Sequence, residues 1–192
     1  VIADQGGFRI SMPHGQPERR IPYPENTVDA RIARGWFWCV QRDTKGNRFV
    51  LSRSEQGKEW EIVAIYQERA NQTLPSIVHI CPIDDDWFLM SARHDGFQIG
   101  HSTAPIVVAR VDEKRRLNVH EAVDIGIDPR KEWPIWVNSM VLTPPFLVTQ
   151  DRVYLKCERI GRFWEISPRG RVKREIRLFS TLTSDTVSIF LR

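Results

Sequence analysis

A histidine–cysteine pair and a run of three aspartates are the first residues in this 192-residue chain whose types and spacing could do chemistry. His79 and Cys81 stand two residues apart, which on a strand places an imidazole and a thiol on one face, as two soft metal ligands would be placed. No second pair follows at metal-ligand spacing, so the sequence predicts no metal site. The three aspartates at 84–86 could hold calcium, but between two strand-like runs they are more typical of a solvated turn.

The charge of the chain is close to balanced, with a formal net charge of +4. The basic excess lies late, in residues 152–177, where lysines and arginines alternate with Glu158, Glu165 and Glu175. Such a run could contact phosphates, but interleaved acids favour exposed outer strands whose charges protect a sheet edge. The sequence therefore predicts no nucleic-acid partner. It also contains no glycine-rich phosphate loop, no serine nucleophile elbow and no paired-cysteine motif, and we expect no cofactor.

The number of cysteines and the hydropathy limit the classes of protein to which the chain could belong. Cys39, Cys81 and Cys157 each lie in a strand-like run, and an odd number of strand cysteines predicts buried thiols rather than a disulfide framework. No apolar run approaches 18 residues and no signal peptide is seen, so we expect no membrane partner. The first residue is valine, which suggests a processed or excised piece. The compartment and the oligomeric state stay open.

Residues 48–66, RFVLSRSEQGKEWEIVAIY, are the clearest structural element. Apolar and polar residues alternate on both sides of a polar turn that contains Gly57, which predicts a β hairpin. Glu55, Gly57 and Trp60 have the spacing acid-x-Gly-x-x-Trp. A carboxylate at Glu55 could accept backbone N–H groups across the turn, Gly57 could take a positive φ, and Trp60 could cover the apolar side.

The rest of the chain repeats this rhythm of short strands and turns, and no stretch has a helical period. We expect a single all-β domain over residues 1–192. Residues 1–24 are predicted to be loop-rich with one short strand. A strand-like passage is predicted to open at 24–28, and ARIARG at 30–35 is predicted to turn it. Further strands are predicted at 8–11, 36–40, 77–82, 87–92, 105–112, 117–123, 136–143, 146–149, 153–157, 163–167, 172–178 and 185–191.

A weak internal repeat runs through these strands. WEIVAIY, PIVVARVD and RFWEIS occupy similar places, as do NRFVLS, WFLMSA and RVYLKC, at intervals of roughly 45 to 57 residues. This period is typical of four-stranded propeller blades and gives about four of them. The fold class predicted is therefore a β-propeller, partial in this chain; a β-sandwich is the alternative.

Residues 24–60 also carry a family resemblance. The hairpin resembles the Asp-box of sialidase-type (BNR-repeat) β-propellers, with Arg53 and Glu55 where serine and aspartate are usual. An acidic E-x-x-V strand, a glycine turn and a strand that ends in arginine precede it, in the order of that family. GFRISMP at 7–13 is faintly similar to the family's F-R-I-P motif.

The resemblance implies a site for an acidic sugar. Arginines clamp the sugar carboxylate in this family, a role that guanidinium chemistry suits. By position Arg42 resembles one clamp arginine, Glu25 resembles the glutamate that activates a tyrosine nucleophile, and Arg9 is a poorer match for another arginine. Arg93 and Arg110 are further candidates by strand position, and Trp38 is a candidate for stacking on a sugar ring. Tyr23, Tyr66 and Tyr154 are the only tyrosines, and none matches the expected late strand.

Three hypotheses about function follow. The chain is a sialidase-like glycoside hydrolase acting on acidic sugars, a non-catalytic propeller that binds carbohydrate or protein, or a structural propeller domain of a larger protein. An exported protein is implied by the family resemblance alone.

Overall fold

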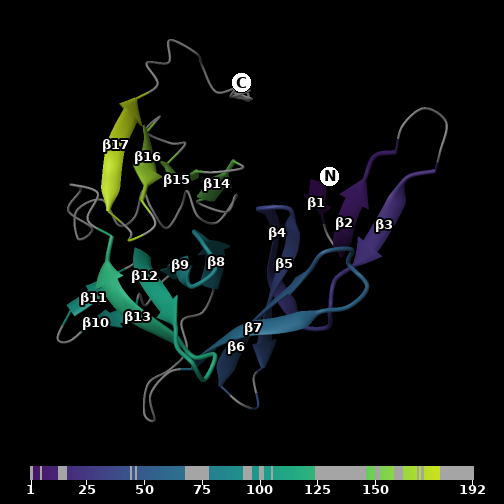
Figure 1. Cartoon of the computed structure of the whole chain (residues 1–192), viewed down its shortest axis with the longest axis horizontal. Coiled ribbons are helices and arrows are strands. Elements are labelled where there is room, and N and C mark those ends of the chain that lie inside the picture. The colour runs from purple at the N-terminus through teal and green to yellow at the C-terminus, as the bar shows by residue number, and fades with distance from the viewer. Residues whose placement is uncertain are drawn as a thin grey trace.

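In the computed structural model, β strands are the only regular structure of the residues described, which are 2–4, 6–12, 17–43, 45, 47–67, 78–92, 97–99, 102–104, 106–123, 146–149, 152–157, 162–167, 169 and 171–177. The strands form three four-stranded sheets, one three-stranded sheet and a separate hairpin (Figure 1). The all-β fold predicted from the sequence is confirmed for these residues. The predicted strands at 136–143 and 185–191, and Arg93, lie outside them.

We number the larger sheets I to IV in chain order. Sheet I holds β1 (Ile2–Asp4), β2 (Gly7–Ile10) and β3 (Arg19–Pro22). Sheet II holds β4 (Thr27–Ala33), β5 (Trp36–Asp43), β6 (Arg48–Ser54) and β7 (Glu61–Gln67). Sheet III holds β8 (Val78–Pro82), β9 (Trp87–Ala92), β12 (Ile106–Val111) and β13 (Leu117–Ala122). Sheet IV holds β14 (Phe146–Val148), β15 (Val153–Cys157), β16 (Arg162–Ile166) and β17 (Val172–Arg177).

Each sheet is an antiparallel meander whose strands lie side by side in the order of the sequence. Sheet III is interrupted once, where the hairpin of β10 (Phe97–Ile99) and β11 (Ser102–Ala104) separates β9 from β12. Short turns suit this topology because antiparallel neighbours need only a few residues to reverse the chain. The first strand of every sheet therefore lies at one edge and the last strand at the other.

Both faces of the inner sheets carry buried side chains, and this explains the continuous apolar runs in β5 and β12. Along β5, Trp38 and Val40 pack against sheet III, whereas Phe37 and Cys39 pack against sheet I. Sheet III repeats the arrangement: Met90 and its neighbours face sheet II, whereas Cys81, Leu89, Ile106 and Val108 face sheet IV. Because side chains alternate along a strand, three apolar layers join the four sheets in chain order.

The first strands of sheets II, III and IV meet at a common centre (Figure 1). The carboxylate of Asp29 on β4 accepts a hydrogen bond from the backbone N–H of Ile80 on β8 (3.2 Å). The guanidinium carbon of Arg31, also on β4, lies 5.3 Å from the ring centroid of Phe146 on β14. Sheets stacked as parallel layers pack about 10 Å apart, which would hold β4 and β14 about 20 Å apart with sheet III between them. The three sheets therefore converge at β4, β8 and β14.

A structural repeat links the same three sheets. In each of them, one extra residue bulges from the fourth strand where it pairs with the third. The bulged residues are Val63 in β7, His120 in β13 and Lys173 in β17. A bulge bends its strand and increases the local twist, so the three outer strands share one irregularity at intervals of 57 and 53 residues.

The turns between third and fourth strands repeat as well. Each begins with a side-chain oxygen that accepts a backbone N–H further along the turn, as in Asx and Ser/Thr turns. Ser54 Oγ accepts from Gly57 (2.8 Å), Asp112 Oδ1 accepts from Lys114 and Arg116 (2.9 and 2.8 Å), and Ser167 Oγ accepts from Arg171 (3.0 Å). The carboxylate of Glu55 was expected in this role, but Ser54 takes it and Glu55 is exposed.

Several predicted elements need correction. The passage at 30–35 is mostly strand: β4 continues to Ala33, and the turn is confined to Arg34 and Gly35. β1, β3, β10 and β11 were not predicted, because they are short strands among glycines and prolines. In the predicted repeat, WEIVAIY falls on the fourth strand of its sheet, but PIVVARVD and RFWEIS fall on third strands. The observed intervals of 57 and 53 residues lie within the predicted range, but the predicted alignment was shifted by one strand.

Candidate functional site

An open cleft of about 480 Å³ lies where sheet III faces the β16–β17 turn of sheet IV. Its lining is basic and aromatic, with one acid: Trp87, Arg110, His120, Glu121, Arg169 and Arg171. Four of these side chains come from sheet III and the other two come from the turn. The cleft therefore depends on the packing of one sheet against the next.

The sheet III wall is organised around an indole ring. Trp87 and Arg110 are cross-strand partners on β9 and β12, and the guanidinium carbon of Arg110 lies 5.5 Å from the Trp87 ring centroid, a cation–π distance. His120 is the bulged residue of β13, and its ring meets Trp87 edge-on at 5.2 Å. The bulge leaves His120 without a ladder partner on β12, and a bulge of this kind changes the direction of the side chain.

Hydrogen-bonded turns hold the walls of the cleft in place. Asp84 Oδ1 accepts the backbone N–H groups of Asp86 and Trp87 (3.0 and 2.8 Å) at the start of β9. On the opposite wall, the Ser167 N–H donates to the Arg171 carbonyl at 2.8 Å, in addition to the Ser167 hydroxyl contact. The turns at both walls of the cleft are thus closed by hydrogen bonds.

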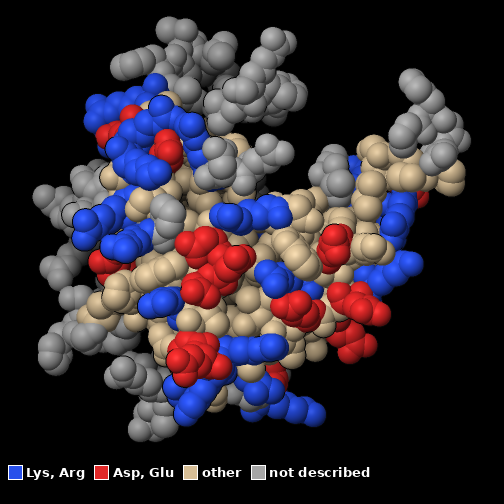
Figure 2. Space-filling view, in the orientation of Figure 1, with Lys and Arg blue, Asp and Glu red and all other residues tan. Residues whose placement is uncertain are grey.

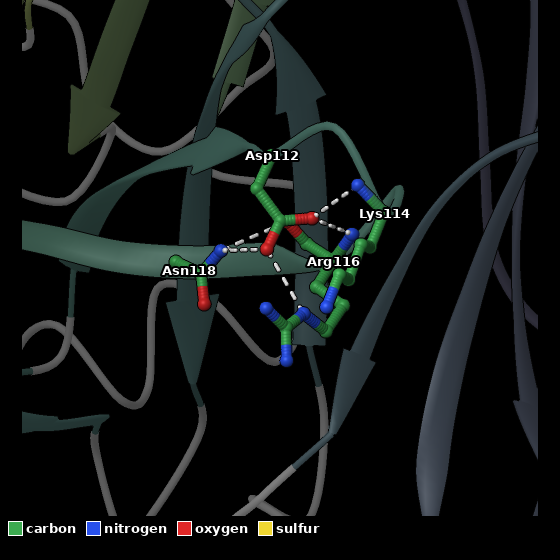
Figure 3. A network of polar contacts seen from close by, with 4 residues as sticks. All are labelled: Asp112, Lys114, Arg116 and Asn118. Carbon is green, nitrogen blue, oxygen red and sulfur yellow. Dashed lines mark hydrogen bonds and ion pairs between the residues drawn. The ribbon is translucent and has the colours of Figure 1, made fainter.

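Asp112 fixes the β12–β13 turn that follows Arg110 (Figure 3). Besides two backbone N–H groups, its carboxylate accepts from Arg116 Nε at 2.9 Å and Asn118 Nδ2 at 3.2 Å. These donors, foremost the backbone N–H of Arg116, lower the pKa of Asp112 to about 2. A carboxylate committed to four donors serves the turn and is poorly suited to proton transfer.

The three arginines of the cleft keep their guanidinium groups available. Among the residues that the structure describes, no hydrogen bond or ion pair engages the guanidinium of Arg110, Arg169 or Arg171; Arg110 contacts Trp87 through its π face. Three such groups around one open cleft give its lining the positive charge that an anion would require.

A second cluster of polar side chains lies buried at the centre where β4, β8 and β14 meet. Arg31 donates to Asp29 at 2.6 Å, and His79 Nδ1 lies 3.3 Å from the same carboxylate. Burial by itself would raise the pKa of Asp29, but Arg31 and His79 outweigh it and lower the pKa to about 2. Asp29 is 7% exposed and Arg31 is 8% exposed, so this cluster joins sheets rather than meeting a ligand.

A mixed-charge cleft of about 520 Å³ on sheet II is a weaker candidate. It is lined by Trp36, Trp60 and several charged residues of the β6–β7 turn. Its arginine, Arg53, lies 4.4 Å from the Trp36 ring centroid and donates to Glu61 at 3.1 Å. The arginine of this cleft is therefore already engaged by a carboxylate and an indole ring.

The two residues expected to be catalytic lie near each other. Glu25 is exposed in the turn before β4, and the backbone N–H of Arg42 on β5 donates to the carbonyl of the adjacent Asn26 at 2.9 Å. The Arg42 guanidinium lies 5.9 Å from the ring centroid of Phe49. Neither residue lines the basic cleft of sheet III.

The predicted substrate-binding residues are scattered. Arg110 lies in the cleft, whereas Arg9 is exposed on β2 and pairs with Glu18 at 3.3 Å. Trp38 is 3% exposed: its indole N–H donates to the Ala33 carbonyl, and its ring packs against Phe88 in the core. Arg169 and Arg171 were not singled out; their only signal was membership of the late basic run.

His79 and Asp84, which were considered as metal ligands, make other polar contacts. His79 approaches Asp29, and Asp84 holds its own turn. Among the described residues, no group of three or more histidine, cysteine, aspartate or glutamate side chains could hold a metal ion. The same part of the chain contains no helix long and apolar enough to cross a membrane.

Comparison of the chain with protein-family models, with curated proteins and with solved structures gave no match. The function is therefore argued from the cleft itself.

Proposed function

We propose that this chain is a propeller-type module that binds an acidic carbohydrate, with the sugar carboxylate held by Arg110, Arg169 and Arg171. One observation carries the proposal: three guanidinium groups without a described polar partner line one cleft beside an indole ring. Guanidinium binds carboxylate through two parallel hydrogen bonds and stays charged at any ordinary pH. The indole supplies apolar surface for the C–H groups of a sugar ring.

The propeller part of the proposal has separate support. Sheets II, III and IV converge at their first strands and share a bulge and a capped turn at the same places. Propeller blades are four-stranded sheets repeated around a centre, and an arrangement of that kind accounts for both observations.

Binding is favoured over hydrolysis. Glycoside hydrolases generally need two carboxyl groups across the scissile bond, and among the described residues Glu121 is the one acid that lines this cleft. The basic and aromatic side chains hold a ligand well without supplying that second group.

Titration calorimetry with an acidic monosaccharide, galacturonate, and its neutral counterpart, galactose, tests the proposal. We expect galacturonate to bind, galactose not to bind, and each of Arg110→Gln and Arg171→Gln to weaken binding about tenfold through loss of a charge-assisted hydrogen bond. Arg171→Lys should fall between wild type and Arg171→Gln because lysine keeps the charge but not the planar fork.

Arg19→Gln is the control, because Arg19 is exposed on β3 and away from the cleft. It should bind galacturonate as wild type does. Equal binding of galactose, or binding that is indifferent to Arg110 and Arg171 in folded variants, would rule out carboxylate recognition at this cleft.

A further inference from the structure

The positive charge of the chain is concentrated on sheet IV. Its described residues, 146–149, 152–157, 162–167, 169 and 171–177, hold eight lysines and arginines against two glutamates, a net charge of +6. Because the whole chain carries +4, all other residues together carry −2. Figure 2 shows lysine and arginine side chains gathered over the region that β16 and β17 occupy in Figure 1.

The two glutamates do not neutralise this surface. Glu165 is shared by Arg174 at 2.6 Å and Arg152 at 3.8 Å. Glu175 is shared by Arg177 at 2.8 Å and Arg162 at 3.3 Å. Because each carboxylate is shared by two guanidinium groups, each cluster keeps a net positive charge.

The surplus continues from the cleft along β17. Arg171 lines the cleft, Lys173 is the exposed bulge residue two positions on, and Arg177 ends the strand. A strand rises about 3.3 Å per residue, so Arg171 and Arg177 stand about 20 Å apart. Lys173 has no polar partner among the described residues. A single sugar in the cleft could not reach this far, whereas a chain of sugars could.

The aromatic residues of sheet IV decide between two kinds of polyanion. Proteins that bind single-stranded nucleic acid stack bases on exposed aromatic rings. On sheet IV every described aromatic side chain is buried: Phe146, Tyr154, Phe163 and Trp164 are all at most 9% exposed. Beyond the cleft and its Trp87 ring, the described surface of sheet IV therefore offers exposed charge and no exposed aromatic ring, which suits a polymer held there through its acidic groups.

We propose that the cleft and β17 together bind a linear acidic polysaccharide, with one sugar carboxylate in the cleft and the following residues along Arg171, Lys173 and Arg177. This inference rests on the proposed function, since it takes the cleft as the anchoring site. It adds the substrate class: a polymer with regularly spaced carboxylates, not an isolated acidic sugar.

Calorimetry with a length series of oligogalacturonates, from dimer to octamer, tests the inference on the whole chain. We expect affinity to rise about tenfold or more from dimer to octamer, and the octamer to lose more affinity on added salt, because more exposed ion pairs are screened. Lys173→Gln with Arg177→Gln should weaken octamer binding about three- to tenfold and leave dimer binding unchanged. Lys45→Gln with Lys58→Gln removes the same charge from exposed positions of sheet II and should change neither.

The outcomes show whether the extended site fails alone or together with the cleft. Dimer binding with no gain in the octamer, or equal octamer binding in the β17 variant and wild type, overturns the extended site and leaves the cleft intact. No binding of any oligomer overturns both proposals. An oligodeoxynucleotide of equal charge that binds as tightly as the octamer would overturn the assignment to polysaccharide, since the surface would then select charge alone.

Discussion

Asp29 shows how a charged residue can hold a β protein together from inside. Its carboxylate is almost wholly buried, yet it meets Arg31 on its own strand and His79 and the Ile80 N–H on the next sheet. A buried charge is costly unless it is paired and hydrogen-bonded. The partners of Asp29 come from two sheets, so the same contacts that satisfy its charge fix where those sheets meet.

Asp29→Asn should destabilise the fold by about 3 kcal/mol at pH 7, because it leaves Arg31 buried without a counter-charge. The pKa of Asp29 is about 2 in the folded chain, below its ordinary value of 3.8, so the folded state favours the charged form. This stabilisation is complete above about pH 4 and is lost as the pH falls through about 2. Urea unfolding of both proteins between pH 7 and pH 2 should show the difference narrowing toward acid.

Asp85→Asn is the matched control, because Asp85 is exposed in the β8–β9 turn. It should change the free energy of unfolding by less than about 0.5 kcal/mol. A stability difference for Asp29→Asn that persists at pH 2 would show that lost packing, not lost charge, causes it.

The thiols of Cys39 and Cys81 should be inert in the native protein. Burial raises their pKa values to about 12 and about 11, and the thiolate is the reactive form. In a Cys157→Ser background, a thiol reagent at pH 8 should label neither cysteine in buffer and both in denaturant. Rapid labelling in buffer would contradict their burial in the core.

At the scale of elements, the β6–β7 turn shows that a glycine can be required for two reasons. Gly57 has φ +73°, and a Cβ there would clash with the Ile21 side chain on β3. Gly35 has a similar φ of +80°, but a Cβ there would meet nothing within 4 Å. The first glycine serves both backbone and packing, whereas the second serves the backbone alone.

Gly57→Ala should therefore lower the free energy of unfolding by about 3 kcal/mol and Gly35→Ala by about 1 kcal/mol. Both variants strain the left-handed backbone, and Gly57→Ala alone also overpacks its surroundings. Thermal or urea unfolding of the two variants measures the difference. Equal losses of stability in the two variants would mean that the Ile21 side chain can shift without an energetic cost, and that sheet I is not packed tightly against this turn.

At the scale of the whole molecule, the contact between Arg31 and Phe146 is the main evidence that the sheets converge at their first strands. It joins sheets II and IV, which sheet III separates in the order of packing. Parallel layers about 10 Å apart would not bring these two residues together, so the contact supports the radial arrangement that we propose.

A double-mutant cycle tests this contact in solution. Arg31→Lys keeps a charge beside Asp29 but loses the planar guanidinium, and Phe146→Leu removes the ring. The two changes should couple by about 0.5–1 kcal/mol in urea unfolding. Coupling of zero, with both single variants folded, would place β4 and β14 apart and remove the main support for a propeller-type centre.

The sequence by itself determined the local features of this protein. Period-two alternation located β8, β9, β13, β15 and β17 to within a residue or two, and the polar turn with Gly57 gave the β6–β7 hairpin. Strand and turn preferences act between near neighbours, so they can be recognised without the fold. β4 was misjudged in part because its charged residues are buried and paired, which a hydrophobic pattern cannot show.

Only the tertiary structure decided what lies beside what. Trp87, Arg110 and His120 approach one another through strand pairing and a bulge, and Arg169 and Arg171 join them through the packing of another sheet. In the sequence, Arg110 stood out by strand position alone, and the late arginines belonged to a basic run assigned to edge protection. Periodicity fixes which face of a strand a residue occupies. Which sheet then covers that face depends on contacts between distant segments, and those contacts made the site.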